Sequence, residues 1–199
     1  GSLGFTLVAM AITLVIFGLL LGGMILPLMT LQEQTTYSES RQKLSEIREA
    51  LVGYGMSHGY LPCPAVSASN GAEDRSGVTG ACNKRVGFLP WAELGFQKLD
   101  SWGHLYRYSV SAVFSDSVTK ILLTSLGDIT VIARDINGAT SNILSIPAVV
   151  TSHGKQAYFA YQDDGVQIAN TSATNADEVV NGSDVAGTTF YTRDVTKNA

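Results

Sequence analysis

Residues 5–31 read FTLVAMAITLVIFGLLLGGMILPLMTL, and this stretch decides how the chain is organised. It is uncharged: the first charged residue is Glu33, so all 30 charged side chains (13 Lys and Arg plus 17 Asp and Glu) follow it. About 20 apolar residues in a helix cross the hydrocarbon core of a membrane. A secretory signal peptide would have a basic start and a shorter apolar region before a small-residue cleavage site. The stretch therefore predicts a hydrophobic transmembrane or filament-core helix over residues 1–31.

The next segment keeps a helical period but becomes amphipathic. Its larger apolar side chains recur at spacings of three, four and seven, which places them on one helix face: Tyr37, Leu44, Ile47, Leu51 and Tyr54. Glycines at 53, 55 and 59 then favour the end of the helix. We therefore expect an amphipathic continuation over residues 32–57 that packs on the rest of the chain.

Helix-weakening residues cluster inside the apolar stretch. Gly18, Gly22 and Gly23 lower helix propensity, and Pro27 removes a backbone donor and clashes with the preceding turn. This clustering predicts a place where the helix kinks or locally unwinds. The alternative is ordinary helix packing in a membrane, where small residues are common.

The two cysteines, Cys63 and Cys82, lie in a polar stretch rich in Gly, Ser and Asn. Such a stretch buries little core of its own, and a bridge would remove roughly 3 kcal/mol of unfolded-state entropy. This predicts a disulfide and an oxidising compartment. The alternative is two separate buried thiols.

Residues 58–199 are predicted to form an exported, β-rich globular head. Strands are expected where β-branched and aromatic residues concentrate between turn signals: 105–110, 120–126, 128–134, 143–150, 156–161 and 188–192. Gly127 and the pair at 137–138 are turn signals, and the polar residues 162–181 are expected to be a long surface loop. The predicted fold class is α+β, with an antiparallel sheet packed on the amphipathic half of the helix.

Several functional classes find no support in the sequence. The formal net charge is −4 and the basic residues are scattered, so we expect no nucleic-acid partner. Residues 55–59 fit G-x-S-x-G, but they follow a helix instead of the strand that a nucleophile elbow requires. The histidines at 58, 104 and 153 are far apart in sequence and form no zinc motif. We therefore expect no enzyme and no cofactor.

The sequence contains candidate ligands for calcium. Asp128, Asp135 and Asn137 carry the hard oxygen atoms that calcium prefers, although no twelve-residue calcium-loop signature is present. Acidic loops are more often simply solvated, so these residues form only a candidate set.

The chain resembles the type IV pilin superfamily, which includes the pseudopilins of type II secretion. The resemblance rests on Gly4-Phe5-Thr6-Leu7, the pattern at which a prepilin peptidase cuts after the glycine, and on Gly18 and Pro27 as helix breakers. It continues more loosely through LPCPA at 61–65, GFLPW at 87–91, DSWG at 100–103 and AVVTSHGK at 148–155.

This resemblance implies cleavage between Gly4 and Phe5, methylation of the new terminus, and a filament built from N-terminal helices. The implied partners are copies of the chain itself, the inner-membrane assembly machinery and, before assembly, the membrane. The implied location is the inner membrane of a Gram-negative bacterium and then the cell surface. The implied filament-core packing residues are Phe5, Leu7, Val8, Ala9, Leu14, Phe17, Leu21, Ile25 and Leu28.

One departure from the family pattern leaves alternatives open. The family has a glutamate as the fifth mature residue, and if Phe5 is the first residue then that place holds Ala9. A buried carboxylate is costly unless paired, so its loss removes a registry device instead of stability. The chain is then either a filament subunit registered by another route or a minor, tip-located pseudopilin. A third alternative is a membrane-anchored adhesin or binding domain that never polymerises. A mature start at Gly1 would add four residues to the core.

Overall fold

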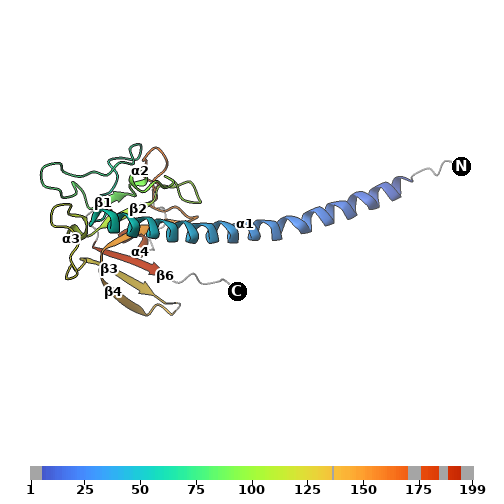
Figure 1. Ribbon diagram of the computed structural model, residues 1–199. Coiled ribbons are helices and arrows are strands. Elements are labelled where there is room, and N and C mark those ends of the chain that lie inside the picture. The colour runs from blue at the N-terminus through green and yellow to red at the C-terminus, as the bar shows by residue number, and fades with distance from the viewer. Residues whose placement is uncertain (1–5, 136, 170–175, 184–187, 194–199) are drawn as a thin grey trace. The chain divides into compact units, whose positions relative to one another are not determined.

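A computed structural model describes residues 6–135, 137–169, 176–183 and 188–193, and within the first helix the side chains of residues 20–30 are outside the description. The chain divides into two units, Gly1–Glu39 and Ser40–Ala199. The second unit contains the predicted head, residues 58–199, together with the C-terminal part of the long helix, and we call this whole unit the head. Figure 1 shows the helices and strands in chain order: α1 (Leu7–His58), β1 (Val86–Phe88), α2 (Trp91–Leu94), β2 (Arg107–Val110), α3 (Ala112–Ser115), β3 (Ile129–Arg134), β4 (Thr140–Ile146), β5 (Ala148–Thr151), α4 (Ala176–Asn181) and β6 (Thr189–Arg193).

Helix α1 is the long N-terminal helix expected from the sequence. At its start the Thr6 hydroxyl oxygen accepts the N–H of Ala9 at 3.4 Å, which satisfies one donor that the first turn leaves unpaired. At its end Gly59 adopts a φ of 79°, a left-handed conformation that costs glycine little. The helix therefore ends in the glycine-rich segment that the sequence indicated.

The predicted break and membrane span concern the same part of α1. The helix assignment runs through Gly18 and Pro27 without interruption. The packing around Gly22, Gly23 and Pro27 lies outside the described part of the structure, so the kink stays a prediction. Over the part of the chain that is described, no helix is long and apolar enough to cross a membrane.

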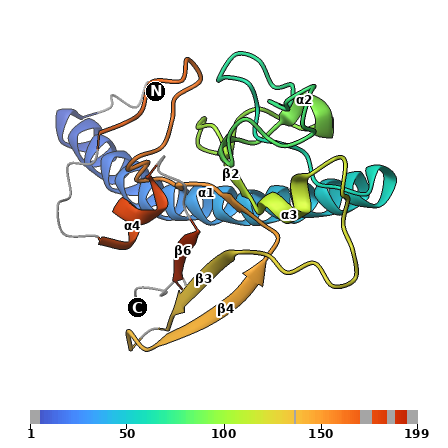
Figure 2. The same cartoon turned by 90° about the vertical axis from the view of Figure 1, so that its left-hand side faces the viewer.

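The core of the head forms where the C-terminal half of α1 meets the first sheet. Ile47 and Leu51, one helical turn apart on the predicted apolar face, are buried against Tyr106, Tyr108 and Val110. The hydroxyl of Tyr108 is buried and donates to the carbonyl of Pro62 at 3.0 Å, so the phenol of Tyr108 is paired inside the core. Figures 1 and 2 place α2 on one side of this half of α1 and β3 and β4 on the other.

The first sheet has the order β1-β2-β5 and is antiparallel throughout. In the central strand, Tyr108 pairs with Gly87 on one side and Val150 on the other. All four residues of β2 are buried, whereas the alternating sequence LYRYSV predicted a half-buried strand. The difference arises because β2 is covered on both faces. Arg107 is buried as well, and its guanidinium carbon lies 4.9 Å from the centre of the Tyr161 ring.

The second sheet has the order β4-β3-β6 and is mixed. β3 and β4 form an antiparallel hairpin whose turn is closed by the Gly138 N–H on the carbonyl of Asp135 at 3.0 Å. β6 pairs with β3 in parallel, with Val131 opposite Phe190. The expectation of a purely antiparallel sheet is therefore wrong for this pair, because a strand that returns from α4 arrives in the same direction as β3.

Some predicted strands do not form. Residues 120–126 lie outside every strand: Lys120 has a φ of 56°, and the segment turns at Leu122, whose carbonyl accepts the N–H of Ser125 at 2.9 Å. Gly127 is not a hairpin turn, but a Cβ there would lie 2.1 Å from the carbonyl oxygen of Ile146, so glycine permits a close backbone approach.

Two further segments differ from expectation. The predicted strand 156–161 has positive φ values at Ala157 and Phe159, which break an extended chain, so only Tyr161 forms isolated bridges. The predicted strand 143–150 is two strands in different sheets, separated at Pro147. Strand β1 lies outside the predicted strands, and α4 lies in the expected surface loop 162–181.

Candidate functional site

The first candidate site is the apolar surface of α1 before the head. Its described side chains between Leu7 and Leu19 carry no charge, and the large ones are exposed on all sides of the helix, from 50% at Ile16 to 88% at Leu7. A helix that is apolar all round is normally buried, because exposed apolar surface of this extent attracts a partner. The described side chains of this segment therefore have the composition of a buried helix but are exposed.

The polar groups of this surface are already satisfied within the helix. The hydroxyl of Thr13 donates to the carbonyls of Ala9 and Met10 at 3.1 and 2.9 Å. The hydroxyls of Thr35 and Thr36 donate in the same way, one turn back, at 2.9 and 3.0 Å. Since the hydroxyls of Thr13, Thr35 and Thr36 have acceptors within the helix, they can enter an apolar environment at little polar cost.

The structure places some of the predicted packing residues on this surface. Leu7, Val8, Leu14 and Phe17 are exposed, and Ala9 is half-buried. Among the described residues, nothing lies within 4 Å of the position that a Cβ at Gly18 would take. The remaining predicted residues of this segment lie outside the described side chains: Gly4, Phe5, Leu21, Gly22, Gly23, Ile25, Pro27 and Leu28.

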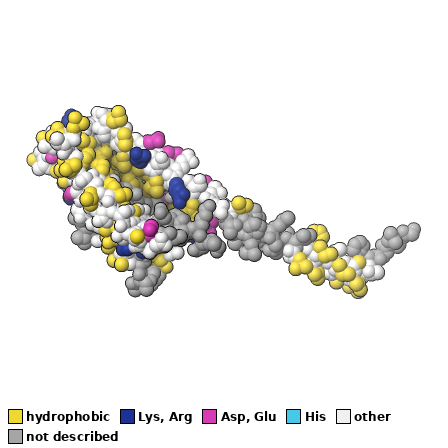
Figure 3. Space-filling model, turned by 90° about the horizontal axis from the view of Figure 1, so that it is seen from below, with side chains coloured by type: hydrophobic (Ala, Val, Ile, Leu, Met, Phe, Trp, Pro, Cys, Tyr) yellow, Lys and Arg dark blue, Asp and Glu magenta, His cyan; other side chains and the backbone are white. Residues whose placement is uncertain are grey.

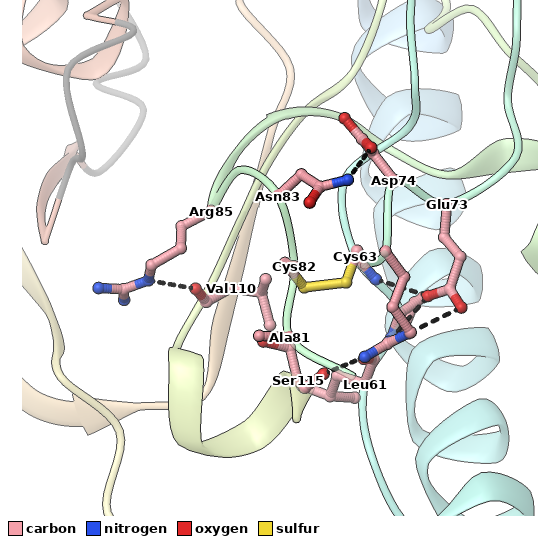
Figure 4. The surroundings of a disulfide bond; sticks show 12 residues. Leu61, Cys63, Glu73, Asp74, Ala81, Cys82, Asn83, Arg85, Val110 and Ser115 are labelled. Carbon is pink, nitrogen blue, oxygen red and sulfur yellow. Dashed lines mark hydrogen bonds and ion pairs between the residues drawn. A yellow bond between two sulfur atoms is a disulfide. The ribbon is translucent and has the colours of Figure 1, made fainter. Parts of the chain in front are cut away.

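The second feature is the stapled loop, defined as residues 63–82. Cys63 and Cys82 form a disulfide with a Cα–Cα distance of 5.3 Å, and Cys63 is fully buried (Figure 4). The loop is also braced by its own backbone: the Asp74 N–H donates to the carbonyl of Pro64 at 2.9 Å, and the Asn83 N–H to that of Asp74 at 3.0 Å. The predicted disulfide is thus part of an ordered scaffold.

Arg75 lies at the centre of the stapled loop and donates all five of its N–H groups. Its Nε and Nη2 atoms donate to the two carboxylate oxygens of Glu73 at 2.9 and 2.8 Å. The other N–H groups donate to the carbonyls of Gly80, Ser115 and Leu61. One side chain therefore joins the loop to the end of α1 and to α3.

Glu73 completes this arrangement from the acidic side. Its Oε2 atom also accepts the N–H of Cys63 at 2.9 Å. Burial alone would raise the pKa of this carboxyl, but the hydrogen bonds from Arg75 and Cys63 and the charge of Arg75 outweigh burial and lower the pKa. The ion pair is therefore structural, with both members engaged inside the fold.

The serine of the G-x-S-x-G sequence has no catalytic setting. Ser57 lies in the last turn of α1 and is exposed, and its hydroxyl donates to the carbonyl of Tyr54 at 3.0 Å. His58 contacts the same hydroxyl at 2.8 Å and stacks on the Tyr54 ring at 4.0 Å between centroids. Among the described residues no carboxylate is hydrogen-bonded to His58, so the third member of a catalytic triad is not seen there.

Segments that are far apart in sequence meet at one buried carboxylate. Asp100 accepts the backbone N–H of His104 at 2.9 Å and the hydroxyl of Ser152 at 2.7 Å. His153 follows Ser152, and burial together with the nearby Arg107 charge lowers its pKa to about 4. The Ser152 hydroxyl is thus committed to Asp100, and the histidine stays neutral at physiological pH.

The calcium candidates are held apart by strand β3. Asp128 precedes the strand and accepts Nη2 of Arg85 at 2.6 Å, whereas Asp135 follows it and accepts the N–H of Asn137 at 2.9 Å. Six extended residues separate the two carboxylates, about 20 Å at the rise of a strand. In the described part of the chain, no three His, Cys, Asp or Glu side chains are grouped to hold a metal ion.

Comparison with protein-family models, with curated proteins and with solved structures finds no significant match to this chain.

Proposed function

We propose that the chain is a structural subunit of an extracellular filament of the type IV pilus kind, held together by packing of N-terminal helices. The observation that carries the proposal is the apolar surface of α1, which is uncharged, internally hydrogen-bonded and exposed in a single chain. Removing a leucine- or phenylalanine-sized side chain from water contributes roughly 1.5–3 kcal/mol. Several such side chains on one helix provide ample free energy for association with copies of the same helix.

The small residues of α1 support helix–helix contact. Among the described residues, nothing lies within 4 Å of the position that a Cβ at Gly18 would take, so this glycine leaves room for a neighbouring helix. Glycines let two helix backbones approach closely, which strengthens dispersion contacts between them. Storage of the helix in the inner membrane before assembly belongs to the same proposal and would be tested by membrane fractionation.

The head is suited to the outer surface of such a filament. A disulfide and a fully paired arginine hold the stapled loop in one shape, and both devices keep working in an oxidising medium outside the cell. The head therefore supplies stability, and α1 supplies assembly.

Ala9 favours a specialised version of this role. Its small apolar side chain offers no carboxylate to pair with the terminal amine of a neighbouring subunit. A minor or tip subunit needs fewer identical neighbours and so depends less on such a pairing. This is the second candidate, and it predicts fibres only in the presence of other subunits.

The test is a pair of matched substitutions in the full-length chain. Phe17→Asp places a charge on the apolar surface of α1, whereas Val78→Asp makes a similar change at a side chain that is 95% exposed in the stapled loop. Negative-stain electron microscopy and sedimentation should show fibres that contain the wild-type and Val78→Asp chains but no Phe17→Asp chain.

Three outcomes have defined meanings. Fibres that incorporate Phe17→Asp as well as wild type would overturn the proposal. Wild-type chains that enter fibres only together with other pilins would identify a minor subunit. A chain that never enters a fibre and keeps an uncut N-terminus by mass spectrometry would support the anchored binding domain instead.

A further inference from the structure

Strand β4 is an open edge of the second sheet. In the order β4-β3-β6 it has one neighbour, β3, so among the described residues its outer row of N–H and C=O groups pairs with no strand. Six of its seven residues are exposed, and the neighbouring Ile143 and Leu144 are 50% and 65% exposed on opposite faces. An exposed edge with apolar side chains on both faces is a template for strand addition.

Protection by charged side chains is missing from residues 140–144 of this strand. Natural edge strands are blunted by lysine, proline or inward-pointing charge, but the sequence has no charged residue from 136 to 154. The nearest interruptions are Ser145, with a φ of 60°, and Pro147. They limit regular pairing to residues 140–144, which we call the β4 edge.

Exposed leucines lie close to one end of this edge. The backbone of Gly127 lies against the carbonyl of Ile146, as the 2.1 Å approach of a Cβ there shows. Leu126 precedes it, and Leu122 and Leu123 come from the same loop, all strongly exposed. Figure 3 shows hydrophobic side chains gathered on the surface seen from below, the side where Figure 1 places β3 and β4.

We propose that the β4 edge is a self-association site at which a second copy of this chain adds its own β4 edge antiparallel to the first. The partner is inferred from charge and shape: a neutral strand offers nothing to a charged peptide, and a second copy presents an equally neutral strand of equal length. A twofold axis at Asn142 sets Asn142 opposite its equivalent and Ser141 opposite Ile143 of the second copy.

This register has favourable side-chain contacts. The two Asn142 amides face each other and can exchange hydrogen bonds, and the two Ile143 side chains become diagonal neighbours on the other face. The contact is isologous, so it closes as a pair and does not propagate. Since it uses only the head, it does not depend on the filament proposal; where both hold, it joins two filaments side by side.

The experiment uses a single added thiol. Both native cysteines are bridged, so Asn142→Cys gives the full-length chain its only free thiol. Directly opposed residues of antiparallel strands have Cα atoms about 4.5–5.5 Å apart, within disulfide range. We expect disulfide-linked dimers of Asn142→Cys in non-ionic detergent at a rate at least about tenfold above that of Val78→Cys, an exposed control away from the edge.

A second substitution tests the cause of the cross-link. Adding Ile143→Lys to Asn142→Cys brings two positive charges together across the axis and should slow dimer formation at least about tenfold. Adding Phe17→Asp instead should leave the rate unchanged, which separates this contact from filament assembly. Equal cross-linking of Asn142→Cys and Val78→Cys, or no effect of Ile143→Lys, would overturn the proposal. Association that is lost with Ile143→Lys, while Asn142→Cys alone forms no cross-link, would overturn the symmetric pairing.

Discussion

Replacing Arg75 by methionine should strongly destabilise the head. The substitution keeps a similar length but removes five hydrogen bonds at once, two to Glu73 and three to backbone carbonyls. The side chains of Glu73 and Arg75 are only 17% and 12% exposed, so the carboxylate would be left charged and nearly buried. Breaking a buried pair from one side costs about 3–5 kcal/mol, a large share of the 5–15 kcal/mol that typically stabilises a domain.

The loss should depend on pH in a defined direction. In the wild type the folded-state pKa of Glu73 is lowered, so its stabilising contribution is present above the unfolded value of 4.5 and is lost as pH falls through the folded pKa. Without Arg75, burial raises the folded-state pKa, so the variant gains relative stability when Glu73 is protonated. The free-energy difference between wild type and variant should therefore shrink from pH 7 to pH 3.5.

The assay is urea unfolding of the oxidised full-length chain in non-ionic detergent, followed by tryptophan fluorescence from Trp91 and Trp102. The double variant Glu73→Gln/Arg75→Met is the matched control, because it leaves no buried charge at these two positions and should be more stable than Arg75→Met alone. A loss below about 1 kcal/mol at pH 7, or a double variant less stable than Arg75→Met, would refute the reasoning.

Three further predictions use the same assay. Cys63→Ala/Cys82→Ala should lower the free energy of unfolding by about 3 kcal/mol, because the open loop gains unfolded-state entropy; an unchanged midpoint would contradict this. Gly127→Ala should cost about 1–3 kcal/mol because its Cβ meets a backbone carbonyl at 2.1 Å, whereas Gly77→Ala, with open space around it, should be nearly neutral. His153 has a pKa of about 4 folded and 6.5 unfolded, so stability should fall by up to about 3 kcal/mol from pH 6.5 to pH 4, and His153→Gln should flatten that dependence.

Local periodicity predicted the parts of the fold that depend on local sequence. Ile47 and Leu51 were placed on the buried face of α1 because helical spacing alone decides which side chains share a face. The hairpin turn after Asp135 was predictable because Asn137-Gly138 carries its own turn preference. The local sequence predicted a strand over residues 188–192, where β6 forms, but the parallel pairing of β6 with β3 depends on a contact between distant segments that no local pattern records.

The misread segments have a common cause. Residues 120–126 are rich in Ile and Leu, which favours a strand by composition, yet no neighbouring strand is available and the leucines stay exposed. Conversely, β2 is buried on both faces although its sequence alternates, because the ring of Tyr161 lies over the charge of Arg107. Burial is set by partners that composition does not reveal.

Only some of the polar contacts inside the head could be predicted from the sequence. Glu73 and Arg75 are two residues apart, and in an extended segment that spacing puts both side chains on the same face, so their pairing had a readable signal. The meeting of His104 and Ser152 at Asp100 had none, since a turn and the end of β5 converge there only in the folded chain.

The parallel pair of β3 and β6 constrains the order in which the head can be completed. Residues 130–134 precede their β6 partners, residues 189–193, by about sixty positions in the chain. Asp177 of α4 accepts hydrogen bonds both from Arg134 of β3 and from Arg193 of β6. Until β6 pairs with β3, β3 is hydrogen-bonded to a strand on one side only, that of β4. A chain shortened before Thr189 would leave the β6-facing border of β3 unpaired, in addition to the outer border of β4.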